Sequence, residues 1–224
     1  LLFDWPGDQP VSIDGYKKAQ DNAVASGPRL AEVLSRIIRD VRPAKIWIEG
    51  SSMGCQVVCD AFEKMHEDPS LADAETEIDH VILAAPDVGA NEFRGKFKDH
   101  ITALSRRVTA YVSSDDNALL MSGFLNDDKR LGRQTIREHD PEQLEEAKQL
   151  LVLRGVDPDR FTIIDVTPVD FASFGHGYYL ESPEFYDDFY MRLFDAGEKV
   201  NRRLYLLRCK NGADYWVMQD EGSR

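Results

Sequence analysis

Residues 45–55, Lys-Ile-Trp-Ile-Glu-Gly-Ser-Ser-Met-Gly-Cys, decide the fold of this chain. A short apolar run at 45–48 predicts a strand, and residues 55–65 have the pattern of a helix. Between them Gly50, Ser52 and Gly54 form the motif G-x-S-x-G, which in a strand–turn–helix context is typical of a nucleophile elbow. Glycine tolerates the sharp turn around the serine, and the following helix directs its free N–H groups at the reacting site. We therefore expect Ser52 to be a nucleophile.

The length and composition of the chain limit the possible classes of protein. Its 224 residues suffice for one sizeable α/β domain, and 42% hydrophobic and 30% charged residues are ordinary for a globular protein. The net charge of −13 argues against nucleic acid and anionic membrane surfaces as partners, and no apolar stretch is long enough to span a bilayer. Cys55, Cys59 and Cys209 form an odd set without a CxxC pair, which favours a reducing compartment such as the cytoplasm. Because the chain begins at Leu1 without Met, a targeting signal could precede it, and localisation stays open.

Strand and helix patterns alternate along the rest of the chain. We expect strands at 1–3, 80–85, 107–112 and 161–166, helices at 16–41, 91–104, 141–153 and 181–198, and a hairpin over 203–218 that turns at Asn211-Gly212. Gly27-Pro28 should interrupt the first of these helices, and the acidic stretch 66–79 indicates a solvated loop and not a metal site. The alternation predicts an α/β fold with a mostly parallel sheet.

Four chemically useful side chains follow predicted strands. In parallel α/β sheets function collects at the carboxyl ends of the strands, and Ser52, Asp87, Asp116 and His176 each come after one. A serine hydroxyl needs a base, and the base needs an orienting acid. The order Ser52, Asp116, His176 is the order of nucleophile, acid and base in α/β-hydrolases.

Asp116, Asp87 and His176 also have simpler explanations. Asp116 or its neighbour Asp115 could be a helix N-cap or a turn residue, and Asp87 is either a rival acid or a structural residue that contacts a loop. His176 could be a loop histidine bonded to the backbone, and the aromatic residues around it could be core or could line an acyl pocket. The other histidines end helices, lie in a polar stretch or begin a strand at the wrong end of the sheet: His66, His100, His139 and His80.

Five blocks carry a resemblance to a known group: Phe3-Asp4-Trp5-Pro6, Gly50-Ser51-Ser52-Met53-Gly54, Leu83-Ala84-Ala85-Pro86-Asp87-Val88, Tyr111-Val112-Ser113-Ser114-Asp115-Asp116-Asn117-Ala118-Leu119 and Gly175-His176-Gly177-Tyr178-Tyr179. Together they resemble bacterial α/β-hydrolase-fold proteins of a domain-of-unknown-function family. The resemblance covers 1–194 and implies a mostly parallel sheet with helices on both faces, a serine-hydrolase triad and no settled substrate. We therefore expect a hydrolase domain at 1–200 and a C-terminal hairpin extension at 201–224.

The chain departs from the family pattern in two places. Family members usually carry His where this chain has Ser51. Their strand that ends in a His-Gly loop, which supplies the second oxyanion donor, should precede Leu1 and lie between the strands at 1–3 and 45–48. The Met53 N–H can serve as one donor, and loss of the other would weaken transition-state stabilisation by about 3 kcal/mol. We therefore expect an upstream N-terminal segment, an expectation that direct pairing of 1–3 with 45–48 would contradict.

These features favour a serine hydrolase that cleaves a carboxylic ester or related small acyl compound through an acyl-enzyme. No metal or organic cofactor is implied. A non-catalytic α/β-hydrolase-fold binding module is the alternative, favoured by the missing oxyanion loop and the extra hairpin. Acyl transfer would use the same residues, and the sequence does not indicate an oligomeric state.

Overall fold

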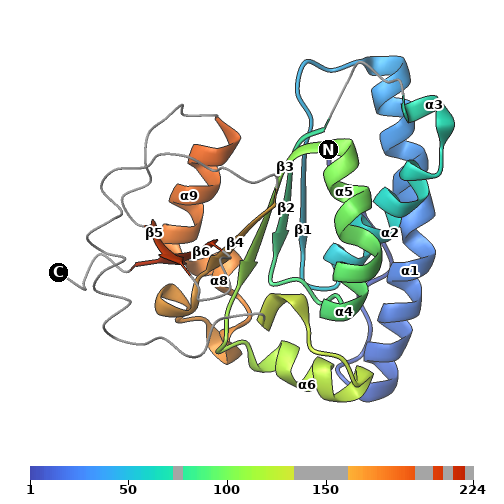
Figure 1. The fold of residues 1–224 in the computed structure, drawn as a ribbon. Helices are drawn as coiled ribbons and strands as arrows, with labels where there is room; N and C mark the ends of the chain where they lie inside the picture. Colours follow the sequence, from blue (N-terminus) through green and yellow to red (C-terminus); the bar gives the residue numbers. More distant parts are fainter. Residues whose placement is uncertain (73–77, 134–160, 195–203, 209–213, 220–224) are drawn as a thin grey trace.

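The protein is built around one six-stranded sheet (Figure 1). The computed structural model describes residues 1–72, 78–133, 161–194, 204–208 and 214–219. The strand order is β1-β2-β3-β4-β6-β5, in which the first five are parallel and β5 is antiparallel to β6. The strands are β1 (Trp47–Ser51), β2 (Ile78–Ala84), β3 (Ser105–Val112), β4 (Phe161–Asp165), β5 (Leu204–Arg208) and β6 (Asp214–Met218). The predicted α/β fold with a mostly parallel sheet is confirmed.

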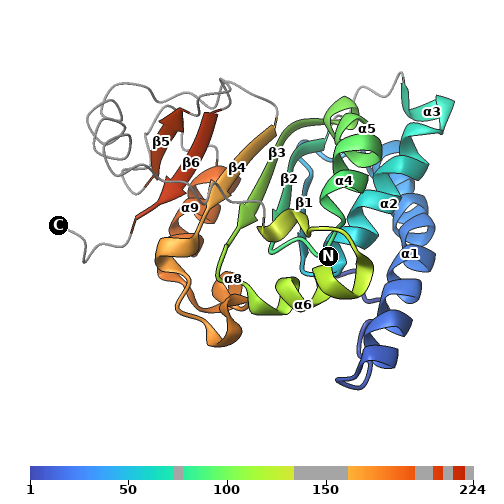
Figure 2. The same cartoon turned by 60° about the horizontal axis from the view of Figure 1, so that its bottom comes forward.

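Helices cover both faces of this sheet (Figures 1 and 2). One face carries α1 (Ile13–Arg36), α2 (Gly54–His66) and α5 (Lys98–Leu104), and the other carries α8 (Tyr178–Glu181) and α9 (Pro183–Leu193). The remaining helical segments are η1 (Ile37–Val41), α3 (Pro69–Ala72), α4 (Ala90–Glu92), η2 (Phe93–Phe97), α6 (Asn117–Asn126), η3 (Leu131–Arg133), η5 (Thr167–Val169) and η6 (Ser173–Gly175). A parallel sheet needs this cover on both faces because its central strands are apolar on both sides.

Alternation along β2 divides the core into two clusters. Val81 and Leu83 pack with residues of α1, α2 and α5, whereas Ile82 and Ala84 pack with residues of α8 and α9. Successive side chains of a strand point to opposite faces of the sheet, so one continuous apolar run supplies both clusters. All four side chains are buried.

The sequence predicts a break or a kink at Gly27-Pro28, but helix α1 runs through these residues as one element, so the predicted break is wrong. A Cβ atom on Gly27 would lie 2.4 Å from the Cβ of Asp60 in α2, which shows how closely the two helices approach. Proline removes one backbone hydrogen bond from a helix interior. The packing of the buried face of α1 against α2 offsets this loss, as tertiary contacts commonly override local propensity.

Residues 1–3 form no strand, and this prediction is also wrong. Leu1 and Leu2 are exposed, at 105% and 89%. Phe3 and Trp5, like Met53, instead pack against the buried cluster that includes Val57. Strand β1 is an edge strand whose outer side has no partner among the described residues. Residues 1–3 therefore do not pair with it, and the upstream segment stays a prediction.

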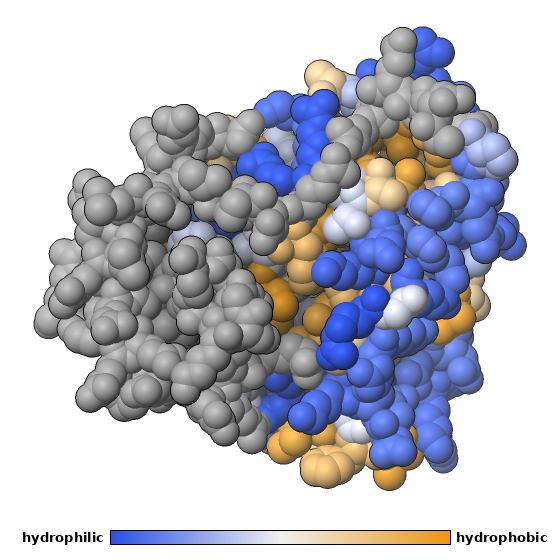
Figure 3. All heavy atoms as spheres, viewed as in Figure 1, coloured by the Kyte–Doolittle hydropathy of each residue, from blue (hydrophilic) through white to orange (hydrophobic). Residues whose placement is uncertain are grey.

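The helix expected at 91–104 is present as the continuous run α4, η2 and α5. Of the helix expected at 181–198, α9 covers Pro183–Leu193, and residues 195–198 lie outside the described residues. Ser182 separates α9 from the short α8, because it caps the new helix at the N–H of Phe185 and Pro183 begins it. Helix α6 was not expected from the sequence. Its Met121 and Phe124 side chains are 68% and 80% exposed. Figure 3 shows apolar surface at the bottom of the molecule, where α6 lies in Figure 1. The helix expected at 141–153 lies outside the described residues.

The C-terminal hairpin is confirmed as β5 and β6, while its Asn211-Gly212 turn lies outside the described residues. Strand β6 pairs with β4, so the hairpin continues the central sheet. The division of the chain into 1–200 and 201–224 stays a prediction. In the described part of the chain, no helix is both long enough and apolar enough to cross a bilayer.

Candidate active site

Ser52 occupies a tight turn between β1 and α2. Its backbone is left-handed, with φ of 51°, a conformation that is strained for a residue with a side chain. The Ser52 N–H donates to the carbonyl oxygen of Ala84 at 2.9 Å, and the Ser52 carbonyl accepts from the Asp87 N–H at 3.1 Å. Both backbone groups of the serine are thus held by the turn that follows β2.

The two glycines of the motif have different roles. A Cβ atom on Gly50 would lie 3.0 Å from Val58 Cγ2 and 3.2 Å from the carbonyl oxygen of Gly54, so a side chain there would crowd α2. A Cβ atom on Gly54 would meet only the indole Nε1 of Trp5, at 3.9 Å. Packing therefore requires glycine at position 50, whereas the expected steric need at position 54 is not observed.

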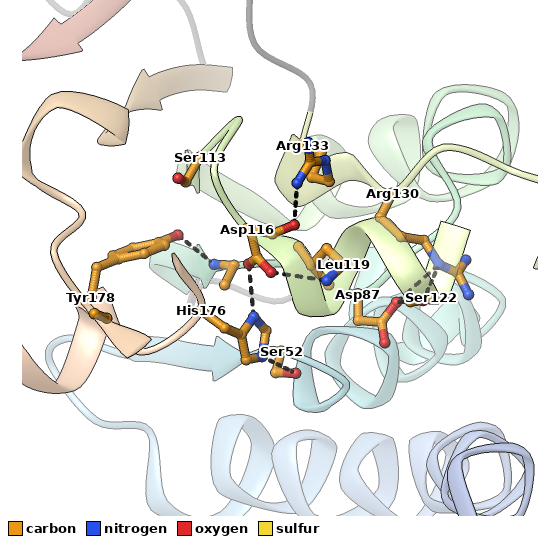
Figure 4. Close-up of polar contacts among 12 residues, drawn as sticks. Ser52, Asp87, Ser113, Asp116, Leu119, Ser122, Arg130, Arg133, His176 and Tyr178 are labelled. Carbon is orange, nitrogen blue, oxygen red and sulfur yellow. Dashed lines mark hydrogen bonds and ion pairs between the residues drawn. The ribbon is translucent and has the colours of Figure 1, made fainter. Parts of the chain in front are cut away.

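Ser52, His176 and Asp116 lie in one hydrogen-bonded chain (Figure 4). His176 Nε2 lies 2.9 Å from Ser52 Oγ, and His176 Nδ1 lies 2.7 Å from Asp116 Oδ2. Asp116 is fully buried, whereas the His176 side chain is 23% exposed. A carboxylate beside Nδ1 favours the tautomer in which Nδ1–H donates to Asp116, which leaves Nε2 to accept the serine proton.

Asp116 acts as a helix cap as well as a partner of His176. Its Oδ1 accepts from the N–H of Leu119 at 2.9 Å and caps α6, and the Arg133 guanidinium donates to its backbone carbonyl. Asp116 is therefore the helix N-cap that was considered for it, and its role as the acid of a triad stays a prediction. The neighbouring Asp115 is exposed, which leaves Asp116 as the carboxylate that bonds to the histidine.

The surroundings of His176 favour its charged form. Burial lowers the pKa of His176, but the hydrogen bond and the negative charge of Asp116 raise it, and the charges of Asp87 and Asp170 add to this. The net result is a pKa above the ordinary histidine value. The same carboxylates would stabilise the imidazolium that forms when the histidine takes a proton from serine.

Glycine and a buried tyrosine fix the loop that carries His176. Gly175 has φ of +65°, and a Cβ atom on it would lie 2.2 Å from the carbonyl oxygen of Asp115, so the loops after β3 and β4 touch here. The Tyr178 hydroxyl accepts from the Ala85 N–H at 2.7 Å and donates to the Tyr111 carbonyl at 2.8 Å. Tyr178 is therefore a core residue that binds the His176 loop to the ends of β2 and β3.

The other candidates lie elsewhere. Asp87 pairs with Arg130 and accepts from Ser122 and Tyr16, so it is the structural residue of the two alternatives considered for it. His80 bonds to Thr109 within the sheet, and the rings of His66 and His100 stack at 4.5 Å. His139 lies outside the described residues. Neither Arg130 nor Arg133 was singled out from the sequence, where no local pattern marks them.

A polar cavity of about 490 Å³ lies beside the Asp116–His176 pair. Asp115, Asn117, Arg133 and Asp170 line it, and Ser52 does not. Burial raises the pKa of Asp170, while the Ser113 hydroxyl that donates to it at 2.6 Å opposes this.

Among the described residues, no group of three or more His, Cys, Asp or Glu side chains is placed to hold a metal ion.

The Met53 N–H is the expected oxyanion donor. Met53 directly follows the serine and precedes the first residue of α2, so its N–H belongs to the positive end of that helix. The second donor was expected from an upstream segment, and that expectation stays a prediction.

A family model described as "Alpha/beta hydrolase of unknown function (DUF900)" matches residues 1–194. The chain belongs to this family. Neither a curated protein nor a solved structure matches the chain significantly. The DUF900 match includes Ser52, Asp116 and His176 and ends before β5, so the hairpin adds two strands to the sheet beyond the matched region.

Proposed function

We propose that this protein is a serine hydrolase that cleaves a carboxylic ester or a related small acyl substrate. The observation that supports this most strongly is the chain of contacts from Asp116 through His176 to Ser52, at 2.7 and 2.9 Å. The three side chains come from loops after three different strands and meet at the carboxyl ends of those strands. Such a constellation is recognised by its geometry and by the role of each group.

The roles follow from the contacts. Ser52 Oγ attacks the acyl carbonyl while His176 Nε2 accepts its proton, and Asp116 holds the imidazole and balances its charge. The Met53 N–H donates to the oxyanion. His176 then gives the proton to the leaving group, and an ester bond to Ser52 remains. Water attacks this acyl-enzyme with His176 as base and releases the acid.

Two observations favour this enzyme over a binding module. His176 lies within hydrogen-bonding distance of both Ser52 and a carboxylate, whereas a blocked or separated set would suit binding alone. The left-handed backbone of Ser52 carries a strain of about 1–3 kcal/mol, and strained residues of this kind concentrate at functional sites.

The charge around the site suggests which substrates to test first. Burial lowers the pKa of His176, whereas the negative charges of Asp116, Asp87 and Asp170 raise it, so three carboxylates act on the base. An anionic acyl group would be repelled here, and neutral esters are therefore the first choice.

The test uses the full-length protein, neutral p-nitrophenyl esters of short acids and a fluorophosphonate probe. Ser52→Ala should lower hydrolysis by roughly 10³-fold or more and abolish labelling. Ser51→Ala is the matched control, which should keep both labelling and activity. If wild-type protein shows neither hydrolysis nor labelling, the proposal is wrong. Product analysis with an added alcohol acceptor separates hydrolysis from acyl transfer.

A further inference from the structure

A buried polar cluster lies next to the Ser52 turn, and the proposed chemistry makes no use of it. It consists of the Asp87–Arg130 ion pair with Ser122 and Tyr16, and we call it the Asp87 cluster. Asp87 and Arg130 have side chains that are only 5% and 4% exposed, and Arg130 Nε lies 2.9 Å from Asp87 Oδ1. Burying two charges is unfavourable unless they are paired and fully hydrogen-bonded, so such a cluster calls for an explanation.

Every member of the cluster is bonded to the others. Ser122 Oγ lies 2.6 Å from Asp87 Oδ1 and accepts from Arg130 Nε at 2.7 Å. The Tyr16 hydroxyl donates to Asp87 Oδ2 and accepts from Arg130, both at 3.1 Å. These contacts join α1, the turn after β2, α6 and the segment that follows α6. Figure 4 shows the contacts among Asp87, Ser122 and Arg130.

We propose that the Asp87 cluster is a positioning element that sets the distance between Ser52 and the His176–Asp116 pair. This inference rests on the proposed hydrolase function. Neither Asp87 nor Arg130 touches a reacting atom, so both act through the backbone and through the elements that they join.

The first half of the link runs to the nucleophile. The Asp87 N–H donates to the Ser52 carbonyl at 3.1 Å, so the residue whose carboxylate is fixed by Arg130 also fixes the strained serine. A left-handed serine persists only where its surroundings hold it in place. Asp87 supplies one of the three backbone hydrogen bonds that do so here, beside those from Ala84 and Cys55.

The second half of the link runs to the acid. Ser122 lies in α6, the helix that begins at the Asp116 cap, so the cluster holds the body of that helix. Residues 130–133 then bond to the loop after β2 and to the loop after β3. The Gly132 N–H donates to the Pro86 carbonyl at 3.0 Å, and its own carbonyl accepts from the Ser113 N–H at 2.8 Å. At the end of this segment, Arg133 donates to the Asp116 carbonyl.

A purely structural role predicts a different outcome from a positioning role. If the cluster only stabilises the fold, its loss reduces the number of folded molecules, and each folded molecule remains fully active. If the cluster sets geometry, each folded molecule becomes slower, since a displacement of about 1 Å can reduce a rate by about 100-fold. We expect substrate affinity to change little, because the polar groups of the cluster are bonded to one another.

The test measures kcat per labelled active site, with the fluorophosphonate probe counting competent sites. Arg130→Met should lower this quantity at least roughly tenfold, with KM within roughly twofold of wild type. Arg130→Lys keeps the charge but lacks the fork of donors, so it should restore part of the rate. Ser122→Ala removes one bond without unpairing a charge and should lower kcat per site about threefold; it decides the question if Arg130→Met does not fold.

Arg192→Met is the matched control, because Arg192 also pairs with a buried carboxylate, Asp188, at 2.7 Å, but on α9. It should lower stability and leave kcat per labelled site unchanged. Values within twofold of wild type for Arg130→Met and Ser122→Ala would overturn the positioning role while leaving the hydrolase proposal intact. Absence of labelling in wild-type protein would overturn both.

Discussion

Ser52 and Ala85 follow neighbouring parallel strands, and both have left-handed backbones, with φ of 51° and 47°. The Ser52 N–H binds the carbonyl of Ala84, the residue before Ala85, at 2.9 Å. The Ala85 N–H binds the Tyr178 hydroxyl at 2.7 Å. The two turns with left-handed residues are therefore hydrogen-bonded to each other and to the loop of His176.

The strain at Ser52 makes its stability effects unusual. Ser52→Gly should increase the free energy of unfolding by about 1 kcal/mol relative to Ser52→Ala, because glycine adopts a positive φ without a steric penalty. Urea unfolding of the two inactive variants measures this difference. At the exposed, right-handed helical position 25, Ala25→Gly should have the opposite sign and destabilise by about 1 kcal/mol. Equal signs at both positions would contradict the strained conformation.

The pH dependence of the reaction should report the carboxylates around His176. The base must be neutral to accept a proton, so kcat/KM for a neutral ester should rise with pH through a pKa above the ordinary histidine value of about 6.5. Asp116→Asn removes the negative charge that raises this pKa and replaces the hydrogen bond to a carboxylate by one to a neutral amide. It should move the limb to lower pH and reduce kcat by about 10²–10⁴-fold. A limb that does not move would contradict the contact seen here.

The same shift affects stability with a defined sign. A histidine whose pKa is raised on folding adds stability below its unfolded pKa, and that stability is lost as pH rises through the folded value. His176→Gln should therefore lower the free energy of unfolding more at a pH below the unfolded pKa of His176 than at a pH above its folded pKa. Thermal unfolding at two such pH values tests this.

Tyr178→Phe should weaken both fold and catalysis. The change removes a hydroxyl that bonds to Ala85 and Tyr111, leaves the Tyr111 carbonyl without that donor, and should cost about 1–2 kcal/mol. Because His176 lies two residues away, kcat should also fall by about tenfold. Tyr190→Phe is the control, since Tyr190 is 62% exposed and should be silent in both measurements. A silent Tyr178→Phe would show that the aromatic ring alone holds the loop.

Two glycine substitutions test the packing of α1 on α2. Gly27→Ala places a Cβ atom 2.4 Å from the Cβ of Asp60 and should destabilise by about 1–3 kcal/mol. Gly95→Ala adds a Cβ atom with nothing within 4 Å and should stabilise the helical run around it by up to about 1 kcal/mol. Both are measured by denaturant unfolding. If Gly27→Ala does not lower the free energy of unfolding, α1 and α2 can move apart without a loss of stability.

Local patterns in the sequence predicted the parallel sheet and the Ser52 turn. An apolar strand, a G-x-S-x-G motif and a helix pattern are each readable within a few residues, and strand ends then predicted where Asp116 and His176 would lie. The structure brings these three residues together. Their catalytic roles remain a proposal.

The features that the sequence did not predict depend on distant contacts. Pro28 stays inside α1 because the buried face of that helix packs against α2. Residues 1–3 form no strand, and among the described residues no strand lies beside them. Arg130 carries no local signal, since its partner is 43 residues earlier in the chain. Helix α6 was missed because apolar residues such as Met121 and Phe124 face solvent and give it no clear amphipathic period.

Asp116 assigns one carboxylate oxygen to the first turn of α6 and the other to His176. This arrangement locks the rotation of the carboxylate, so the acid is already oriented before a substrate arrives. When that first turn frays, we expect Asp116 to lose the position in which it bonds to His176 as well. In the proposed hydrolase, we therefore expect heating to lower activity once the start of this ten-residue helix frays, before the central sheet unfolds.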